Sequence, residues 1–141
     1  EYAFRISGVN LVVGSSGYHF DAYRIGGVHA GIGTDFLAVY GEADFTKHQM
    51  LFSGFVIDRS ADQMAAFVAA DLRIARGVWL TTKVDRFDPA RGIPSDEFTR
   101  YTFGLELFPW PFIELRPQVR FAAEPAGVDN NSALIQLHAW F

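Results

Sequence analysis

The last ten residues, 132–141 (SALIQLHAWF), constrain the fold most, because their side chains alternate with a period of two. One set is apolar and the other contains most of the polar residues: Ala133, Ile135, Leu137, Ala139 and Phe141 against Leu134, Gln136, His138 and Trp140. Successive side chains of a β-strand leave it on opposite sides, so this period predicts a strand. The strand closes on Trp-Phe rather than on a polar tail, which is unusual for a water-soluble domain.

The same alternation recurs along the chain and predicts eight or nine strands in a single domain, 1–141. The predicted strand regions are 2–13 (one or two strands), 18–33, 37–45, 64–74, 78–85, 99–108, 112–121 and 132–141, with a less regular apolar stretch at 50–58. We expect GSSG at 14–17 to form a turn, and Gly26-Gly27 to mark a bulge within one long strand, 18–33. Further short turns are expected at 75–77 and 109–111.

Composition excludes several classes of protein. The chain has no cysteine, which removes disulfides, thiolate zinc sites and covalent haem attachment. A net charge of −4 without a basic block argues against nucleic acid as a partner. There is no run of eighteen apolar residues and no basic-then-apolar leader, so we expect Glu1 to be a mature start or an internal boundary.

Alternation alone does not separate a soluble barrel or sandwich, with its apolar face inside, from a membrane barrel, with its apolar face on lipid. Strand length favours the membrane barrel, since runs near ten residues match the roughly 9–11 that span a bilayer, against about 5–6 in soluble sheets. Connection lengths also favour it. Counted back from the C-terminus, they are long (122–131), short (109–111), long (88–97) and short (75–77).

Aromatic residues supply a third observation. In an up-and-down meander, Trp79, Trp110 and Trp140 fall at the same end as the terminal Phe141. Aromatic girdles form where a barrel meets the two membrane interfaces. We therefore expect a transmembrane antiparallel up-and-down β-barrel, with these four residues as membrane-interface aromatics.

Strand count leaves two forms of this barrel open, because bacterial single-chain barrels have an even number of strands. Either residues 2–13 lie outside the wall of a closed eight-stranded barrel, or the chain is the C-terminal part of a larger barrel.

The terminal strand, alternating and ending on Phe, resembles the last strand of Gram-negative outer-membrane β-barrel proteins. The runs GVWLTTKVDRFDP, TRYTFGLELFPWPFIELRPQVRF and LIQLHAWF, within 76–141, look like the C-terminal portion of porin-like proteins, some of them similar to barrels that sheathe multihaem cytochromes. The resemblance implies residence in the outer membrane, contact with its lipid, recognition of the last strand by the barrel-insertion machinery, and a periplasmic or multihaem cytochrome as a possible partner.

The alternation also predicts which charged residues line the lumen. They are Glu42, Asp44, Asp71, Arg73, Lys83, Asp85, Arg100, Glu106, Glu114, Arg116 and Arg120, together with His138. In a narrow barrel these groups would pair across strands, because unpaired charges away from water are costly. In a wide barrel they would line a water-filled pore and bias its ion selectivity. The near balance of signs favours pairing.

Catalytic and metal sites have weaker support. His19 and Asp21 share a strand face near Ser15 and Ser16, which is the minimum for a hydrolytic pair acting on lipid, but no signature accompanies them. The acidic loop 88–97 does not have the spacing of an EF-hand. The prediction is a porin-like or scaffolding protein with no catalytic residues, metal or cofactor. The alternatives are a small lipid-acting barrel enzyme and a soluble barrel that binds an apolar ligand.

Overall fold

The computed structural model describes residues 1–20, 23–53, 56–124 and 130–140, and of residues 49–53 and 56–60 it describes the backbone alone. Nine β-strands make up this part of the chain. They are β1 (Tyr2–Ile6), β2 (Val9–Phe20), β3 (Tyr23–Gly33), β4 (Leu37–Ser53), β5 (Val56–Ala75), β6 (Val78–Asp88), β7 (Phe98–Trp110), β8 (Ile113–Ala123) and β9 (Ser132–Ala139). Among the described residues no helix is long and apolar enough to cross a membrane.

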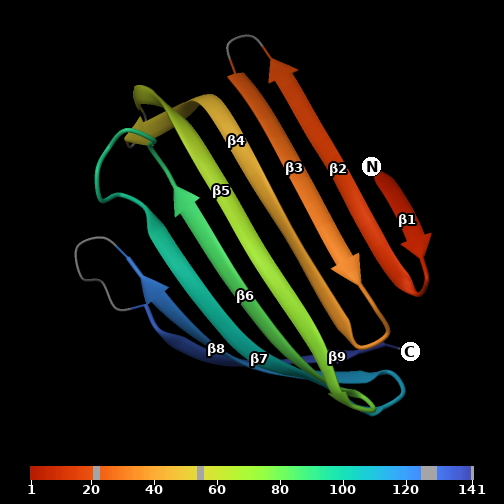
Figure 1. Cartoon of the computed structure of the whole chain (residues 1–141). Coiled ribbons are helices and arrows are strands. Elements are labelled where there is room, and N and C mark those ends of the chain that lie inside the picture. Colours follow the sequence, from red (N-terminus) through yellow and green to blue (C-terminus); the bar gives the residue numbers. More distant parts are fainter. Residues whose placement is uncertain (21–22, 54–55, 125–129, 141) are drawn as a thin grey trace.

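All nine strands belong to one antiparallel up-and-down sheet in the order β1 to β9, each paired with its neighbours in sequence. The predicted all-β meander is therefore confirmed. Figure 1 shows the strands running side by side at a common tilt, in a sheet that curls strongly toward β7, β8 and β9. In the part of the chain that the structure describes, no pairing joins β9 back to β1.

The two ends of the sheet differ in their connections. At one end the strands are joined by the short connections 7–8, 34–36, 76–77 and 111–112. Ser7 and Gly8 have φ angles of 49° and 83°, the paired positive values that a tight hairpin needs to match the twist of its strands. The opposite end carries the connections 89–97 and 124–131, of which 125–129 lie outside the described residues. The predicted long–short alternation in the C-terminal half is confirmed.

The register divides the side chains into a polar face and an apolar face. One cross-strand row of the polar face runs from Arg120 through Thr102 and Lys83 to Ala69 and Tyr40. The adjacent row of the apolar face runs from Ala133 through Val119, Phe103 and Thr82 to Ala70. Because one recess is lined by residues of all the strands from β4 to β9, the polar face is the concave one.

Several sequence predictions for the N-terminal half are wrong. GSSG at 14–17 is not a turn but lies inside β2, paired in unbroken register with β3. The region 18–33 is not one strand, since β2 ends at Phe20 and β3 begins at Tyr23, and Gly26-Gly27 pair regularly without a bulge. Two of these glycines, Gly14 and Gly27, make room for side chains on the concave side. A Cβ at Gly27 would collide with the carboxylate of Asp44.

Two further predictions need correction. Of the two forms left open by the strand count, the one with residues 2–13 outside the wall is contradicted, because β1 and β2 pair within the same sheet as the other strands. The turn predicted at 109–111 occurs two residues later, at 111–112, because Phe112 adopts a positive φ of 74° and β7 extends to Trp110. The irregular stretch 50–58 falls in the β4–β5 hairpin, where register shifts at Thr46/Gln49 and Leu51/Phe52 break the alternation. Residues 54–55 lie outside the described residues.

Candidate functional site

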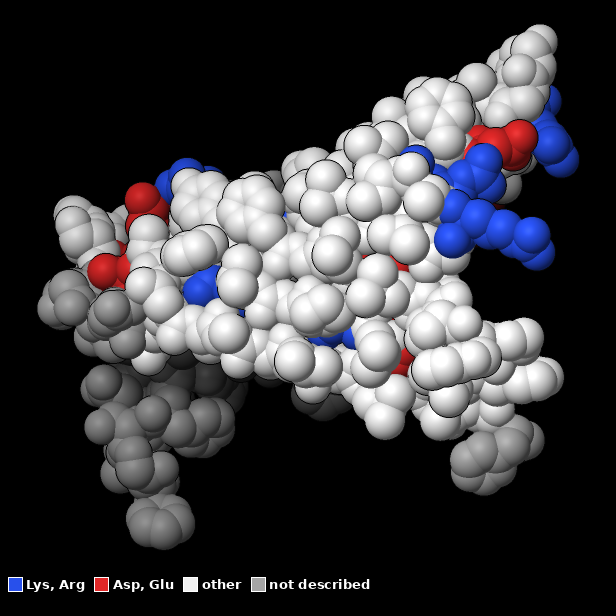
Figure 2. Space-filling model, turned by 90° about the horizontal axis from the view of Figure 1, so that it is seen from below, with Lys and Arg blue, Asp and Glu red and all other residues white. Residues whose placement is uncertain are grey.

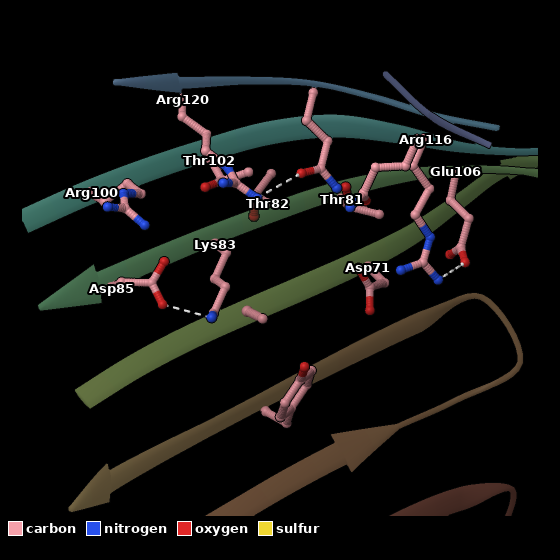
Figure 3. Close-up of a pocket in the computed structure, with 14 residues that line it drawn as sticks. Asp71, Thr81, Thr82, Lys83, Asp85, Arg100, Thr102, Glu106, Arg116 and Arg120 are labelled. Carbon is pink, nitrogen blue, oxygen red and sulfur yellow. Dashed lines mark hydrogen bonds and ion pairs between the residues drawn. The ribbon is translucent and has the colours of Figure 1, made fainter. Parts of the chain in front are cut away.

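The concave polar face contains a recess with a volume of about 480 Å³. Its lining is almost entirely polar: Tyr40, Ala69, Asp71, Thr81, Thr82, Lys83, Asp85, Arg100, Thr102, Glu106, Arg116, Gln118, Arg120 and Gln136. These residues come from six consecutive strands, so the curvature of the sheet, and not any one segment, creates the recess. In Figure 3 the side chains of Lys83, Asp85, Arg100, Glu106 and Arg116 extend from neighbouring strands toward the recess.

An ion-pair cluster occupies one end of the recess, toward the short turns. The Arg116 guanidinium donates to Glu106 Oε1 at 2.6 Å and also to Glu114. Nδ1 of His138 lies 3.1 Å from Glu114 Oε2, so Glu114 links β8 to β9. Glu114 is 5% exposed, and it is the one buried charged residue in the described part of the chain. A buried carboxylate is costly unless it is paired, and these two partners supply the pairing.

The opposite end of the recess has a different balance of charge. Lys83 Nζ lies 2.6 Å from Asp85 Oδ1, on the same strand. Arg100 and Arg120 line the recess beside this pair, and neither has an acidic partner within 4 Å among the described residues. Arg120 donates a long hydrogen bond of 3.5 Å to Gln118 Oε1, and its Nε is buried without an acceptor. Figure 3 shows Arg100, Arg120 and Lys83 toward one side of the view, and Glu106, Arg116 and Asp71 toward the other.

The register places all twelve residues predicted to line a lumen on the polar face. Seven of them line the recess: Asp71, Lys83, Asp85, Arg100, Glu106, Arg116 and Arg120. Glu114 and His138 adjoin it through Arg116, whereas Glu42, Asp44 and Arg73 lie on the same face but outside its lining. Thr81, Thr102, Gln118 and Gln136 also line the recess. They share the strand faces of the predicted charged residues but are not among the twelve.

The predicted interface aromatics gather at the end of the sheet with the short turns. Trp110 is the last residue of β7 and is 64% exposed. The backbone N–H of Trp140 donates to the carbonyl of Phe112 at 3.1 Å, which places Trp140 beside the 111–112 turn. Trp79 is at the same end but on the polar face, opposite Glu106, and is half-buried. Phe141 lies outside the described residues.

The geometry of the described residues does not support a catalytic pair at His19 or a metal site in the loop 88–97. His19 is exposed and lies across the ladder from Arg24, and Asp21 lies outside the described residues. In the 88–97 region, Asp88 Oδ1 accepts a hydrogen bond from the N–H of Ala90 and Glu97 pairs with Arg86. Within the described residues there is no group of three or more side chains that could hold a metal ion.

The apolar face is the second feature of this surface that bears on function. Large apolar side chains are exposed on every strand from β1 to β9, and a few more are exposed in the connections. They include Phe4, Val13, Val28, Ile32, Phe45, Val68, Leu72, Leu80, Val84, Tyr101, Phe103, Val119, Phe121, Ile135 and Leu137. Only two apolar residues of the described chain are buried, Ala69 and Ala90. Figure 2 shows a surface that is mostly uncharged, with most of the charged side chains in view gathered toward its ends.

Comparisons with protein-family models, with curated proteins and with solved structures found no match to this chain. The functional conclusion therefore depends on the fold and on the chemistry of its two faces.

Proposed function

We propose that this chain forms the wall of a Gram-negative outer-membrane β-barrel with a porin-like or structural role and no catalytic activity. The observation that carries the proposal is the inverted polarity of the sheet, because most of its charges lie on the concave face and most of its exposed large apolar residues lie on the convex one. The convex charges Arg24, Lys47 and Arg86 lie near the end of the strands opposite the short turns. Ile135, at 76% exposure, and Leu137, at 63%, illustrate how completely the convex side chains are uncovered.

A soluble monomer rarely exposes a contiguous apolar patch larger than a few hundred Å². Here exposed large apolar residues occur on the convex face of each of the nine strands. Lipid is the surrounding that satisfies this face, since a barrel in a bilayer turns apolar side chains outward and encloses its polar ones. The strands β3, β6 and β8 have 11 residues each, within the roughly 9–11 residues of a tilted transmembrane strand, and β2 has 12.

The direction of the strands bears on how the barrel closes. In a nine-stranded meander β1 and β9 run in the same direction, so pairing them directly would form a parallel pair. An odd number of further strands between them would keep every pair antiparallel, as in bacterial single-chain barrels. This favours a part of a larger barrel over a closed barrel of these strands alone.

A larger barrel favours a porin-like role, with a water-filled pore, over a structural role in which paired charges fill the interior. The ion pairs of Arg116 and Glu114 occupy one end of the polar recess, but Arg100 and Arg120 at the other end are not neutralised. In this proposal β9 is the strand that the barrel-insertion machinery reads, and outer-membrane lipid is the principal partner. A periplasmic or multihaem cytochrome is a partner that only the sequence resemblance suggests.

The experiment that tests the proposal is electrophoresis in SDS, with and without boiling, on protein extracted in detergent. A folded barrel resists cold SDS and shifts in mobility on heating, and we expect this shift for the barrel that contains the chain. Ion conductance in planar bilayers then separates a pore from a scaffold. A chain that is fully soluble and folded without detergent would refute the membrane proposal.

A further inference from the structure

The charges of the recess are sorted along the strands. Toward the short turns Arg116 is matched by two carboxylates, Glu106 and Glu114, with Asp71 nearby. Toward the long connections there are three cations, Lys83, Arg100 and Arg120, and one carboxylate, Asp85. The cationic end therefore has an excess of two positive charges, because three cations face one anion.

The carboxylates within the recess do not reach the two arginines. Asp85 is the cross-strand partner of Arg100, yet it pairs with Lys83 at 2.6 Å. Glu106 is committed to Arg116 at the other end. Arg100 thus lines the recess with no ion pair inside the described part of the chain, and the buried Nε of Arg120 has no acceptor there.

The register brings these donors onto a common patch. Thr102 is the direct cross-strand partner of Arg120, and Arg100 lies two residues before Thr102 on β7. Arg100 and Arg120 are therefore diagonal neighbours on one face, with backbones about 7–8 Å apart. Two long arginine side chains that start from backbones at that spacing, with the Thr102 hydroxyl on the same face, can converge on the oxygens of one small anion. Arginine is well suited to this because its planar fork matches carboxylate and phosphate geometry.

We propose that Arg100, Arg120 and Thr102 form a binding site for an oxyanion, the carboxylate or phosphate group of a solute that enters the recess. This inference rests on the proposed function, because the pore of the proposed barrel is the route by which the solute reaches the site. Bound there, the anion accepts from the guanidinium N–H groups of Arg100 and Arg120 and offsets the excess positive charge. Thr102 donates its hydroxyl hydrogen to the anion, and Lys83 remains with Asp85.

The test is equilibrium dialysis of the folded, detergent-solubilised protein with radiolabelled inorganic phosphate or acetate at low ionic strength. We expect saturable binding of at least one probe to the wild-type protein. The affinity should fall about tenfold or more in each of the single variants Arg100→Gln and Arg120→Gln, which corresponds to the loss of one charge-assisted hydrogen bond. Thr102→Val, which keeps the shape and all the charges, should weaken binding by a smaller factor. Arg24→Gln is the matched control, because Arg24 is an exposed arginine of β3 outside the recess.

The arms of the experiment separate the possible results. Preference for phosphate or for acetate identifies which oxyanion the site takes. No saturable binding of either probe to the wild-type protein at 10 mM-scale concentrations, or equal weakening in Arg24→Gln, would overturn the site. Thr102→Val keeps both arginines, so it tests the site even if the arginine variants do not fold. Unchanged affinity in Thr102→Val would show that Thr102 is not part of the site. A normal heat shift in SDS without anion binding refutes this inference alone, whereas solubility without detergent refutes the proposed function and leaves anion binding measurable.

Discussion

The imidazole ring of His29 lies across the backbone of Gly14, its partner on the neighbouring strand, so that a methyl group on Gly14 would overlap the ring atoms Cε1 and Nε2. The same ring reaches Glu1, whose carboxylate lies 3.4 Å from His29 Nε2. The glycine is therefore required by the side chain opposite it and not by a turn. This is why a segment with the composition of a loop pairs as a strand.

Gly14→Ala should destabilise the fold by about 1–3 kcal/mol, because the added methyl must displace the ring of His29. Combining it with His29→Ala should remove most of that cost, since the atoms that clash are gone. Urea unfolding in detergent micelles measures both. Gly17→Ala is the control in the same strand, where the nearest atom to a new Cβ is 3.9 Å away. An equal loss of stability in both single variants would contradict the close contact.

Glu114→Ala should destabilise the protein far more than Asp85→Ala. Glu114 is 5% exposed and accepts from both Arg116 and His138, so its removal leaves a half-buried guanidinium with one carboxylate partner and costs about 1.5–3 kcal/mol. Asp85 is a partly exposed partner of Lys83 alone, and such pairs contribute about 0–1 kcal/mol. Unfolding midpoints of the two variants give the comparison. Similar values would mean that Glu114 does not hold β8 to β9.

Ile135→Arg and Leu134→Arg should differ strongly, although the two residues are adjacent in β9. Ile135 is on the convex apolar face and Leu134 is on the polar face beside Gln118. If the convex face meets lipid, arginine at 135 costs about 2–4 kcal/mol near the midplane and less toward the rim, whereas arginine at 134 meets the polar interior. Folding yield into vesicles, read by the heat shift in SDS, measures the difference. A soluble sheet would tolerate both substitutions about equally, because position 135 would then face water.

Trp110 should contact lipid and Trp79 should not. Trp110 ends β7 and is largely exposed at the rim, whereas Trp79 shares the polar face with Glu106. Variants that retain a single tryptophan, with the others replaced by Phe, allow the fluorescence of each to be quenched by lipids brominated near the headgroup. We expect strong quenching of Trp110 and weak quenching of Trp79. The reverse order would place the membrane on the other side of the sheet.

The sequence determined the strand periodicity, the up-and-down order and the sorting of charges onto one face, because alternation is a local property that each strand carries in its own residues. It also placed the long connections and the tryptophans in the C-terminal half. It failed in the N-terminal half, where Gly14, Gly17, Gly26 and Gly27 have the composition of turns. The role of Gly14 depends on His29 and that of Gly27 on Asp44, each across the strand, and the local composition does not contain this relation.

Only the tertiary structure decided which charges pair. The twelve residues predicted to line a lumen share the polar face, and the near balance of their charges predicted general pairing. The curvature and register instead give Arg116 two carboxylates, hold Asp85 to Lys83, and leave Arg100 and Arg120 without an acidic partner among the described residues. Ion pairing depends on distances of a few ångströms between side chains on different strands. Those distances are set by the stagger and curl of the whole sheet.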